Sequence, residues 1–448
     1  MTYKLILVLL VTASCSESSD ADGCPALTKP RSGGTMHSYP EQSEADGTVQ
    51  VWKAEDSPHF VATYELSDIQ LTIESCAYVV MEGPSSILVS RSGTLIASGT
   101  EERPITIEAA DPNNPWDTIE TLYVERSGEA EDTMGGYIQM SYVTLSDGGT
   151  TPSGSLHPMI WAHGKDVNVQ NLPPNEHLDL QHVTVQHGTS YGVLLDLGAT
   201  FSSTSTDLTI KDQPTAPLQI GFRSVDAVPS GAYTGNGRDV IEVTPDVSAL
   251  TRNVTIHDRG VAYLFGEDQN AGRFTVGPES GQATTLTIDP GVTMQFRPRN
   301  VLEIESTGSL IARGSEAAPI VFTSSASSPA RGDWTGIQFL GVPSSTSAID
   351  HASVLYAGDD YQSAGLACNV EGSDARDSYG AIAFAERPTK ALVTNTTIAH
   401  SLHNGIDRDW TGDPLDFAPT NTFMDNAGCQ QSYPVPSSNV CPQPVPCD

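Results

Sequence analysis

The sequence predicts an all-β protein in which short strands stack into a solenoid. The clearest stretch is residues 286–339, where apolar triplets are separated by Gly, Pro, Ser and Asp and no helical pattern occurs. Within most triplets apolar and polar residues alternate, as in half-buried strands. The apolar residues Ile288, Ile304, Phe322 and Phe339 recur at nearly constant spacing. Strands and turns that repeat this evenly are typical of stacked coils.

An internal repeat supports the same fold class. Residues 71–107 align without gaps on residues 286–322, including the matched pairs Gly93 with Gly308 and Gly99 with Gly314. A Trp follows each copy, and a second alternating run follows each Trp. The related segments therefore extend over residues 71–147 and 286–358. Composition agrees, because 39 Gly and 30 Pro in 448 residues indicate a turn-rich chain.

The motifs LTIDPGVTMQF, GSLIARGS, GDWTGIQF and SVLYAG, all within residues 286–358, carry a family resemblance. They resemble bacterial surface proteins with right-handed parallel β-helix repeats, which are similar in fold to pectin lyases. The resemblance covers roughly residues 60–427 and implies a right-handed parallel β-helix. It is specific for fold and weak for function, because one fold hosts many activities.

The N-terminus resembles a bacterial export signal. Residues 1–15 hold one Lys, a short apolar run and the sequence Thr-Ala-Ser-Cys, and such a run is too short to anchor in a bilayer. Cys15 stands where a lipobox would place a lipidated Cys, although Thr12 departs from the usual Leu. Ser16, and not Asp, follows the Cys; by the sorting rule that this resemblance implies, such a residue favours the outer membrane. The alternative is an ordinary secretory signal without lipid.

These observations divide the chain into four segments. Residues 1–15 are the signal, and residues 16–47, which are polar and low in complexity, are a flexible tether. Residues 48–427 are the β-helix, and residues 428–448 are a Cys- and Pro-rich tail. The net charge of −33 argues against nucleic acid as a partner. We expect contact with the membrane only through the lipid, on the periplasmic face or the cell surface, and a monomeric protein.

Six cysteines remain if Cys15 is lipidated, and an even number in an exported chain suggests disulfides. The sequence leaves the pairing open. We expect Cys24 with Cys76 at one end of the solenoid. At the other end we expect Cys368 with Cys429 and Cys441 with Cys447, where the open end needs a cover.

Asp359 and Asp360, after a Tyr-Ala-Gly turn, are the candidates for chemistry. Paired carboxylates on a β-helix face bind Ca²⁺ or act as acid and base of a glycoside hydrolase. Related hydrolases add His-Gly and Arg-x-Lys segments on neighbouring coils; no Arg-x-Lys occurs here, and His163-Gly164 and His187-Gly188 lie far from Asp359 in sequence. A solvated loop is the third interpretation. No catalytic residue is therefore assigned, and no cofactor is expected apart from Ca²⁺ at this pair.

Two Arg and three Trp residues are further candidates for ligand contact. We expect Arg297 and Arg299 to be a solvated turn and Trp116 and Trp334 to pack at coil corners. Trp410 lies outside the repeats and is the better candidate for an exposed ring that stacks on sugars.

These observations favour a non-catalytic surface lipoprotein, adhesin-like, that contacts a glycan or a surface protein. The alternative is a polysaccharide lyase or glycoside hydrolase of the pectin-lyase-like class. A stalk without a ligand is the third hypothesis.

Overall fold

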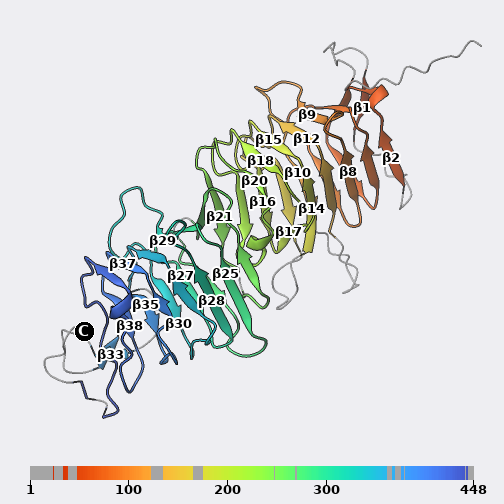
Figure 1. Ribbon diagram of the computed structural model, residues 1–448. Helices are drawn as coiled ribbons and strands as arrows, with labels where there is room; N and C mark the ends of the chain where they lie inside the picture. Colours follow the sequence, from red (N-terminus) through yellow and green to blue (C-terminus); the bar gives the residue numbers. More distant parts are fainter. Residues whose placement is uncertain are drawn as a thin grey trace, which may run out of the picture.

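The computed structural model describes Cys24 and residues 34–38, 48–122, 135–164, 175–246, 248–267, 270–360, 366–368, 375–377, 379–438 and 440–441. These residues form stacked coils of parallel strands that follow one another along a rod (Figure 1). The expected all-β parallel β-helix is thus confirmed. The described residues contain no helix long and apolar enough to cross a membrane.

One sheet runs the length of the described solenoid, and we call it the long sheet. Its strands pair in parallel from one coil to the next. In order they are β4 (Tyr64–Ser67), β7 (Ile87–Ser90), β10 (Ile119–Leu122), β13 (Ile160–His163), β16 (Val193–Asp196), β19 (Leu218–Gly221), β21 (Val240–Thr244), β23 (Ala262–Phe265), β26 (Thr293–Phe296), β29 (Ile320–Ser324), β32 (Ala352–Leu355), β37 (Thr397–Ala399) and β39 (Thr422–Met424).

Two sheets complete the N-terminal coils. The eight-stranded sheet contains β1 (Thr35–His37), β3 (His59–Val61), β6 (Tyr78–Met81), β9 (Ile105–Ala109), β12 (Val143–Ser146), β15 (Thr184–Gln186), β18 (Leu208–Lys211) and β20 (Gly231–Ala232). The six-stranded sheet contains β2 (Val49–Trp52), β5 (Gln70–Ile73), β8 (Thr94–Ser98), β11 (Tyr137–Ser141), β14 (Asn175–Gln181) and β17 (Ala199–Phe201).

Two other sheets complete the C-terminal coils. The first five-stranded sheet contains β22 (Val254–Ile256), β25 (Thr284–Ile288), β28 (Gly308–Arg313), β31 (Ala348–Asp350) and β36 (Val393–Thr394). The second contains β24 (Arg273–Val276), β27 (Val301–Ile304), β30 (Gly336–Phe339), β35 (Gly380–Phe384) and β38 (Asn404–Arg408). The remaining elements are an antiparallel pair, β33 (Leu366–Cys368) and β34 (Ala375–Asp377), and three short 3₁₀ helices, η1 (Ala54–Asp56), η2 (Phe222–Ala227) and η3 (Ala418–Thr420).

The core is a column of apolar side chains that repeats from coil to coil. Ile119, Ile160 and Val193 lie in register on the inner side of the long sheet and are fully buried. Aromatic rings continue the column, with Phe296 stacked on Trp334 at 4.2 Å between ring centroids. Trp116 and Trp334 are both fully buried, which confirms their packing role. Burial of apolar area is the main force that holds such coils together.

The strands of the two aligned sequence segments coincide, but they lie on different faces. β5, β6 and β7 belong to the six-stranded, eight-stranded and long sheets. Their counterparts β25, β26 and β27 belong to the first five-stranded, long and second five-stranded sheets. Because the long sheet runs through both halves, the second copy is displaced by one face around the solenoid.

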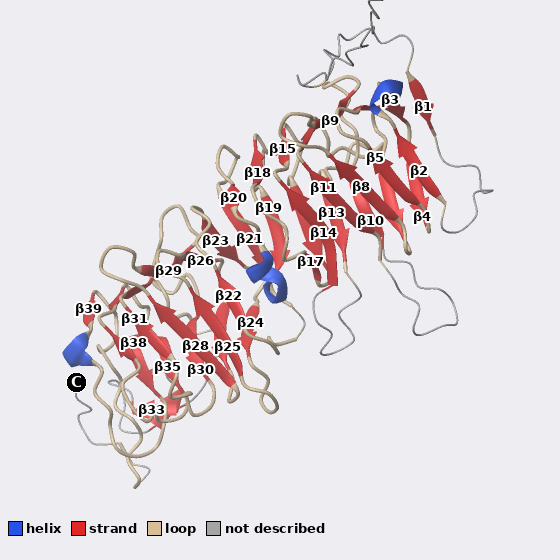
Figure 2. Ribbon diagram, turned by 45° about the vertical axis from the view of Figure 1, so that its right-hand side comes forward, coloured by secondary structure: helices blue, strands red, loops and turns tan. Residues whose placement is uncertain are grey.

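The faces change at a junction in the middle of the rod. The six-stranded sheet ends at β17 and the eight-stranded sheet at β20, while β22 and β24 begin the two later sheets. The short helix η2 lies between these ends (Figure 2). Among the described sheets, only the long sheet continues its strand pairing across this point, through β19, β21 and β23.

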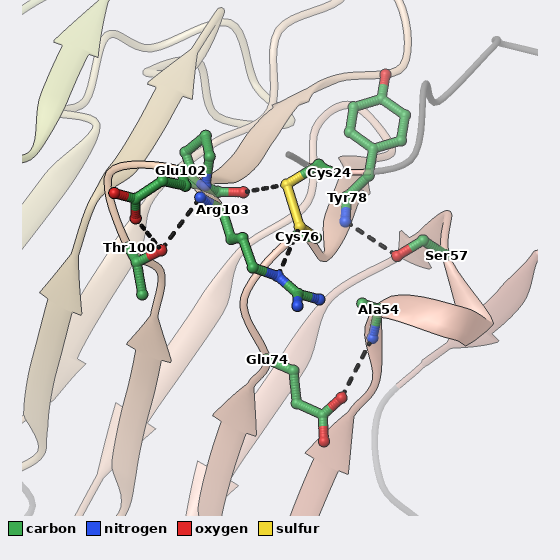
Figure 3. Close-up of a disulfide and its surroundings, with 10 residues drawn as sticks. Cys24, Ala54, Ser57, Glu74, Cys76, Tyr78, Thr100, Glu102 and Arg103 are labelled. Carbon is green, nitrogen blue, oxygen red and sulfur yellow. Dashed lines mark hydrogen bonds between the residues drawn. A yellow bond between two sulfur atoms is a disulfide. The ribbon is translucent and has the colours of Figure 1, made fainter. Parts of the chain in front are cut away.

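Disulfides tie both ends of the described solenoid. Cys24 pairs with Cys76, as expected, and Arg103 donates from Nε to Cys76 Sγ at 3.4 Å (Figure 3). At the other end Cys368 pairs with Cys441, so the expected Cys368–Cys429 and Cys441–Cys447 pairs are wrong. The reason is that the C-terminal segment runs antiparallel to Cys368, with a backbone hydrogen bond from Cys368 to Tyr433.

Candidate functional site

A cluster of aromatic and titratable side chains lies on the outer side of the long sheet at β13. Ile160 and Ala162 are buried, whereas Trp161 and His163 between and after them are half-buried. Since side chains alternate across a strand, Trp161 and His163 share the outer side of the sheet. The sequence therefore places one large ring and one titratable group on the same outer face.

Neighbouring coils bring carboxylates to this pair. Glu120 on β10 is the register partner of Trp161, and Asp196 on β16 is the register partner of His163. Glu120 Oε1 lies 2.8 Å from His163 Nε2, and Asp196 Oδ1 lies 2.7 Å from His163 Nδ1. The Trp161 indole N–H donates to Asp196 Oδ2 at 3.1 Å. We call Glu120, Trp161, His163 and Asp196 the β13 site.

The two carboxylates determine the charge of His163. Burial alone lowers the pKa of this imidazole, but hydrogen bonds and charge from Asp196 and Glu120 outweigh burial and raise the pKa to about 9. His163 is therefore a cation at neutral pH, and both of its ring nitrogens face acidic oxygens. Its side chain is 16% exposed, so water screens these contacts only in part.

A second His–Asp pair supports the indole from the other side. His157 Nδ1 lies 2.9 Å from Asp117 Oδ1, and Ser86 donates to Asp117 Oδ2 at 3.1 Å. The His157 ring meets Trp161 edge-on, with centroids 5.1 Å apart. Trp161 is thus held by ring contacts on two sides and by its own N–H, which fixes an aromatic surface on the face of the sheet.

A buried ion cluster lies further along the same sheet. Glu242 on β21 is 4% exposed; Arg297 Nη2 lies 3.4 Å from its Oε2, and Arg238 also pairs with it. The Tyr191 hydroxyl donates to Glu242 at 3.1 Å, and burial together with Glu242 raises the pKa of Tyr191 to about 12. The expected solvated turn is therefore wrong for Arg297, which also donates to the Gly266 carbonyl; Arg299 is exposed.

The sequence-based candidates lie elsewhere. Asp359 is half-buried and its backbone N–H donates to the Trp334 carbonyl at 3.1 Å, while Asp360 is exposed. Within the part of the chain that the structure describes, no three His, Cys, Asp or Glu side chains gather as a metal site. Glu371 and Asp374, which follow this pair in sequence, lie outside the described residues, as do Cys15 and Cys447. The calcium site at Asp359 and Asp360 stays a prediction.

Trp410 does not provide an exposed ring. It is 2% exposed and its indole N–H donates to the Asp413 carbonyl at 3.0 Å. The C-terminal segment passes alongside it, because Val435 donates its backbone N–H to the Trp410 carbonyl. The expectation of a surface stacking residue at position 410 is wrong for this reason.

The residues of the β13 site were not chosen from the sequence as candidates, although His163 was noted. A usable signal existed in Met159-Ile-Trp-Ala-His163, where the alternation puts a Trp and a His on the face opposite two aliphatic residues. No such signal pointed to Glu120 or Asp196, because these come from other coils.

Comparison with known proteins agrees with the fold. Residues 272–385 match a family model described as a pectate-lyase like beta helix domain. Comparisons with curated proteins and with solved structures gave no match. The match covers β24 to β35, and the parallel sheets extend the same architecture to the N-terminal coils. The chain is therefore a β-helix repeat protein, and its residues 272–385 are similar to the pectate-lyase-like β-helix domain.

Proposed function

We propose that this protein is an exported, lipid-anchored β-helix module that binds an extended glycan on the outer side of the long sheet without cleaving it. The observation that carries the proposal is the fixed, half-buried ring of Trp161 beside two carboxylates on an otherwise regular sheet face.

Binding follows from the chemistry of the β13 site. An indole ring offers an apolar surface on which a sugar ring packs, and its orientation here is set before a ligand arrives. Glu120 and Asp196 each carry oxygens with lone pairs beyond those used by His163, and sugar hydroxyls donate to such oxygens. Apolar contact with a few oriented polar groups is typical of small-ligand sites.

The same geometry disfavours turnover. A lyase needs an unprotonated base next to its substrate, but His163 is protonated at neutral pH and its two ring nitrogens face Glu120 and Asp196. An inverting or retaining hydrolase needs one carboxyl group as an acid and another across the scissile bond. Here an imidazolium occupies the space between the two carboxylates.

The location is part of the proposal. The Cys24–Cys76 and Cys368–Cys441 disulfides fit an oxidising compartment. Cys15 is the residue we propose to carry the lipid, with sorting to the outer membrane. Mass spectrometry of the mature N-terminus tests this: a diacylated N-terminal Cys supports it, and a chain that begins elsewhere without lipid overturns it.

The function is tested by screening the full chain against plant, algal and bacterial polysaccharides. Binding is followed together with release of reducing ends or unsaturated products. We expect binding without product, and a Trp161→Ala variant that binds at least about tenfold more weakly because ring stacking is lost. Tyr356→Ala is the matched control, since it removes a ring at a corner of another coil that stacks on His400.

Other outcomes have definite meanings. Product release that Glu120→Gln or Asp196→Asn abolishes would make the protein an enzyme at the β13 site, and loss with Asp359→Asn would place the chemistry at the sequence-based candidates. If no glycan binds and no product is released, the glycan proposal is overturned, and an adhesin-like contact with a surface protein remains.

A further inference from the structure

A pocket of about 580 Å³ lies at the junction of the solenoid, where β17, η2 and β22 meet. It is separate from the β13 site, since it opens beside the end of the six-stranded sheet and not on the long sheet. The volume is in the range of ligand sites of proteins. The residues that matter for its chemistry are Glu176, Thr200, Asp226, Arg252 and Arg259.

Arg259 is a cation that no described carboxylate neutralises. Its Nε and Nη2 donate to the Val228 carbonyl at 3.0 and 2.7 Å, and no Asp or Glu of the described residues comes within 4.0 Å of its nitrogens. The donors that remain on its guanidinium are available in a pocket that this residue lines. A guanidinium with free donors favours an anionic oxygen.

Arg252 lines the same pocket but differs from Arg259, because a carboxylate neutralises its charge. It holds Asp226 through both carboxylate oxygens, at 2.5 and 2.6 Å. The charge of Arg252 is thereby balanced, and each Asp226 oxygen keeps lone pairs that accept further hydrogen bonds. Ligand hydroxyls are among the groups that donate to such oxygens.

Thr200 supplies an independent sign of a ligand. It is 5% exposed, and its Oγ1 has no hydrogen-bond partner among the described residues. A buried hydroxyl left without a partner costs about 1–3 kcal/mol, and a turn of the Thr200 side chain towards a ligand oxygen in the pocket would remove that cost. Thr200 lines the pocket together with Arg259 and Asp226.

We propose that this junction pocket binds a small organic anion that carries hydroxyl groups. Its carboxylate contacts Arg259, and its hydroxyls contact Asp226 and Thr200. The net charge of −33 does not prevent this, because exposed charges beyond about 8 Å are largely screened at physiological ionic strength. Glu176 is exposed and lines the same pocket, so it opposes the anion weakly.

The test uses the full chain and three probes: D-gluconate, which has both charge and hydroxyls, sorbitol, which has only hydroxyls, and acetate, which has only charge. Binding is measured by ligand-observed NMR and calorimetry. We expect gluconate to bind at least about tenfold more tightly than either of the others. Equal affinity for gluconate and sorbitol, or no gluconate binding at millimolar concentration, overturns the proposal.

Variants place the binding in the pocket. Thr200→Val keeps the shape and removes the unpartnered hydroxyl, so we expect an unchanged or higher Tm and gluconate binding about fivefold weaker. Arg259→Gln should abolish the preference for gluconate over sorbitol, and Glu176→Gln should tighten gluconate binding slightly. Arg387→Gln is the charge-matched control, because Arg387 is exposed and remote from the pocket residues in sequence and contacts.

Two results would contradict this site. One is gluconate binding that Thr200→Val and Arg259→Gln both leave unchanged. The other is gluconate binding lost in Trp161→Ala, which would move the anion to the β13 site. Because glycan binding is expected to survive Thr200→Val, failure here and failure of the proposed function are distinguishable.

Discussion

Two Trp–His clusters in this molecule use the same residue types and reach opposite charge states. Near the N-terminal end, Trp52 stacks on His37 with ring centroids 4.2 Å apart, and His37 Nε2 lies 3.0 Å from His59 Nδ1. In the β13 site Trp161 packs on His163 at 4.6 Å. Burial, reinforced by the His59 charge, lowers the pKa of His37 to about 4, whereas the pKa of His163 is raised to about 9.

The difference comes from what faces the imidazoles. His37 faces another imidazole, and His59 is bonded to the Lys53 carbonyl at 2.8 Å. His163 faces two carboxylates from adjacent coils. Close contact between a Trp ring and a His ring is common to both clusters and therefore does not decide the charge. The coil-to-coil register does, because it selects which side chains become neighbours.

The largest effect we expect is a loss of stability at alkaline pH. The folded-state pKa of His163 lies above its unfolded value of 6.5, so its contribution is complete below pH 6.5 and disappears as pH rises through about 9. One pKa unit corresponds to about 1.4 kcal/mol, which bounds the loss at roughly 3 kcal/mol. Urea unfolding at pH 6.5 and pH 9.5 measures it. His163→Gln should flatten this part of the profile, and an unchanged slope would contradict the assignment.

A smaller loss of folding stability is expected at acid pH. The pKa of His37 is lowered in the folded state, so unfolded chains bind more protons below pH 6.5 and stability falls as pH drops towards 4. Because this side chain is only about half buried, solvent screening reduces the effect to about 1 kcal/mol. The comparison of wild type with His37→Gln between pH 7 and pH 4 isolates it. Equal slopes in the two proteins would remove His37 from the explanation.

The charge of His163 can be changed without touching the ring. Asp196→Asn removes one of the two negative partners and keeps an oxygen for the Trp161 N–H, so the pKa of His163 should fall towards 6.5. NMR titration of histidine-labelled protein measures the shift. Asp207→Asn, next to the more exposed His182, is the control and should leave the His163 titration unchanged.

The smallest effect concerns the edge of the N-terminal cluster. Tyr64 meets His37 edge-on, and its hydroxyl donates to Gln50. Tyr64→Phe keeps the ring contact and removes one partly exposed hydrogen bond, so it should cost about 0.5 kcal/mol in urea unfolding. The His37 titration should not move. A shift of that titration would show that the hydroxyl, and not burial, sets its charge.

The fold could be predicted because residues close together in the sequence determine the strands and turns. Apolar triplets and turn residues repeat along the chain, and each inward side chain needs only to be apolar. The β13 site could not be predicted in the same way. Glu120 and His163 are 43 residues apart, and the loops between coils differ in length, so the register partner of a given residue cannot be counted from sequence.

The errors have the same origin. The sequence around Trp410 and Cys368 predicts an exposed ring and a pairing with Cys429, yet the C-terminal segment determines the environment of both residues. It covers Trp410 through the contact with Val435 and brings Cys441 to Cys368. A segment that packs outside the repeat obeys no repeat pattern, and its position depends on tertiary contacts alone.

The displacement of the two repeat copies by one face has a consequence for how the rod meets other molecules. Related surfaces of the two halves look in different directions, since β10 lies on the long sheet and its counterpart β30 on the second five-stranded sheet. In a duplicated solenoid without this displacement, the related surfaces of the two segments would lie on the same face and form one continuous surface along the rod. In this protein the two related segments do not form one repeated surface, and among the described sheets only the long sheet offers a face that continues from one half to the other.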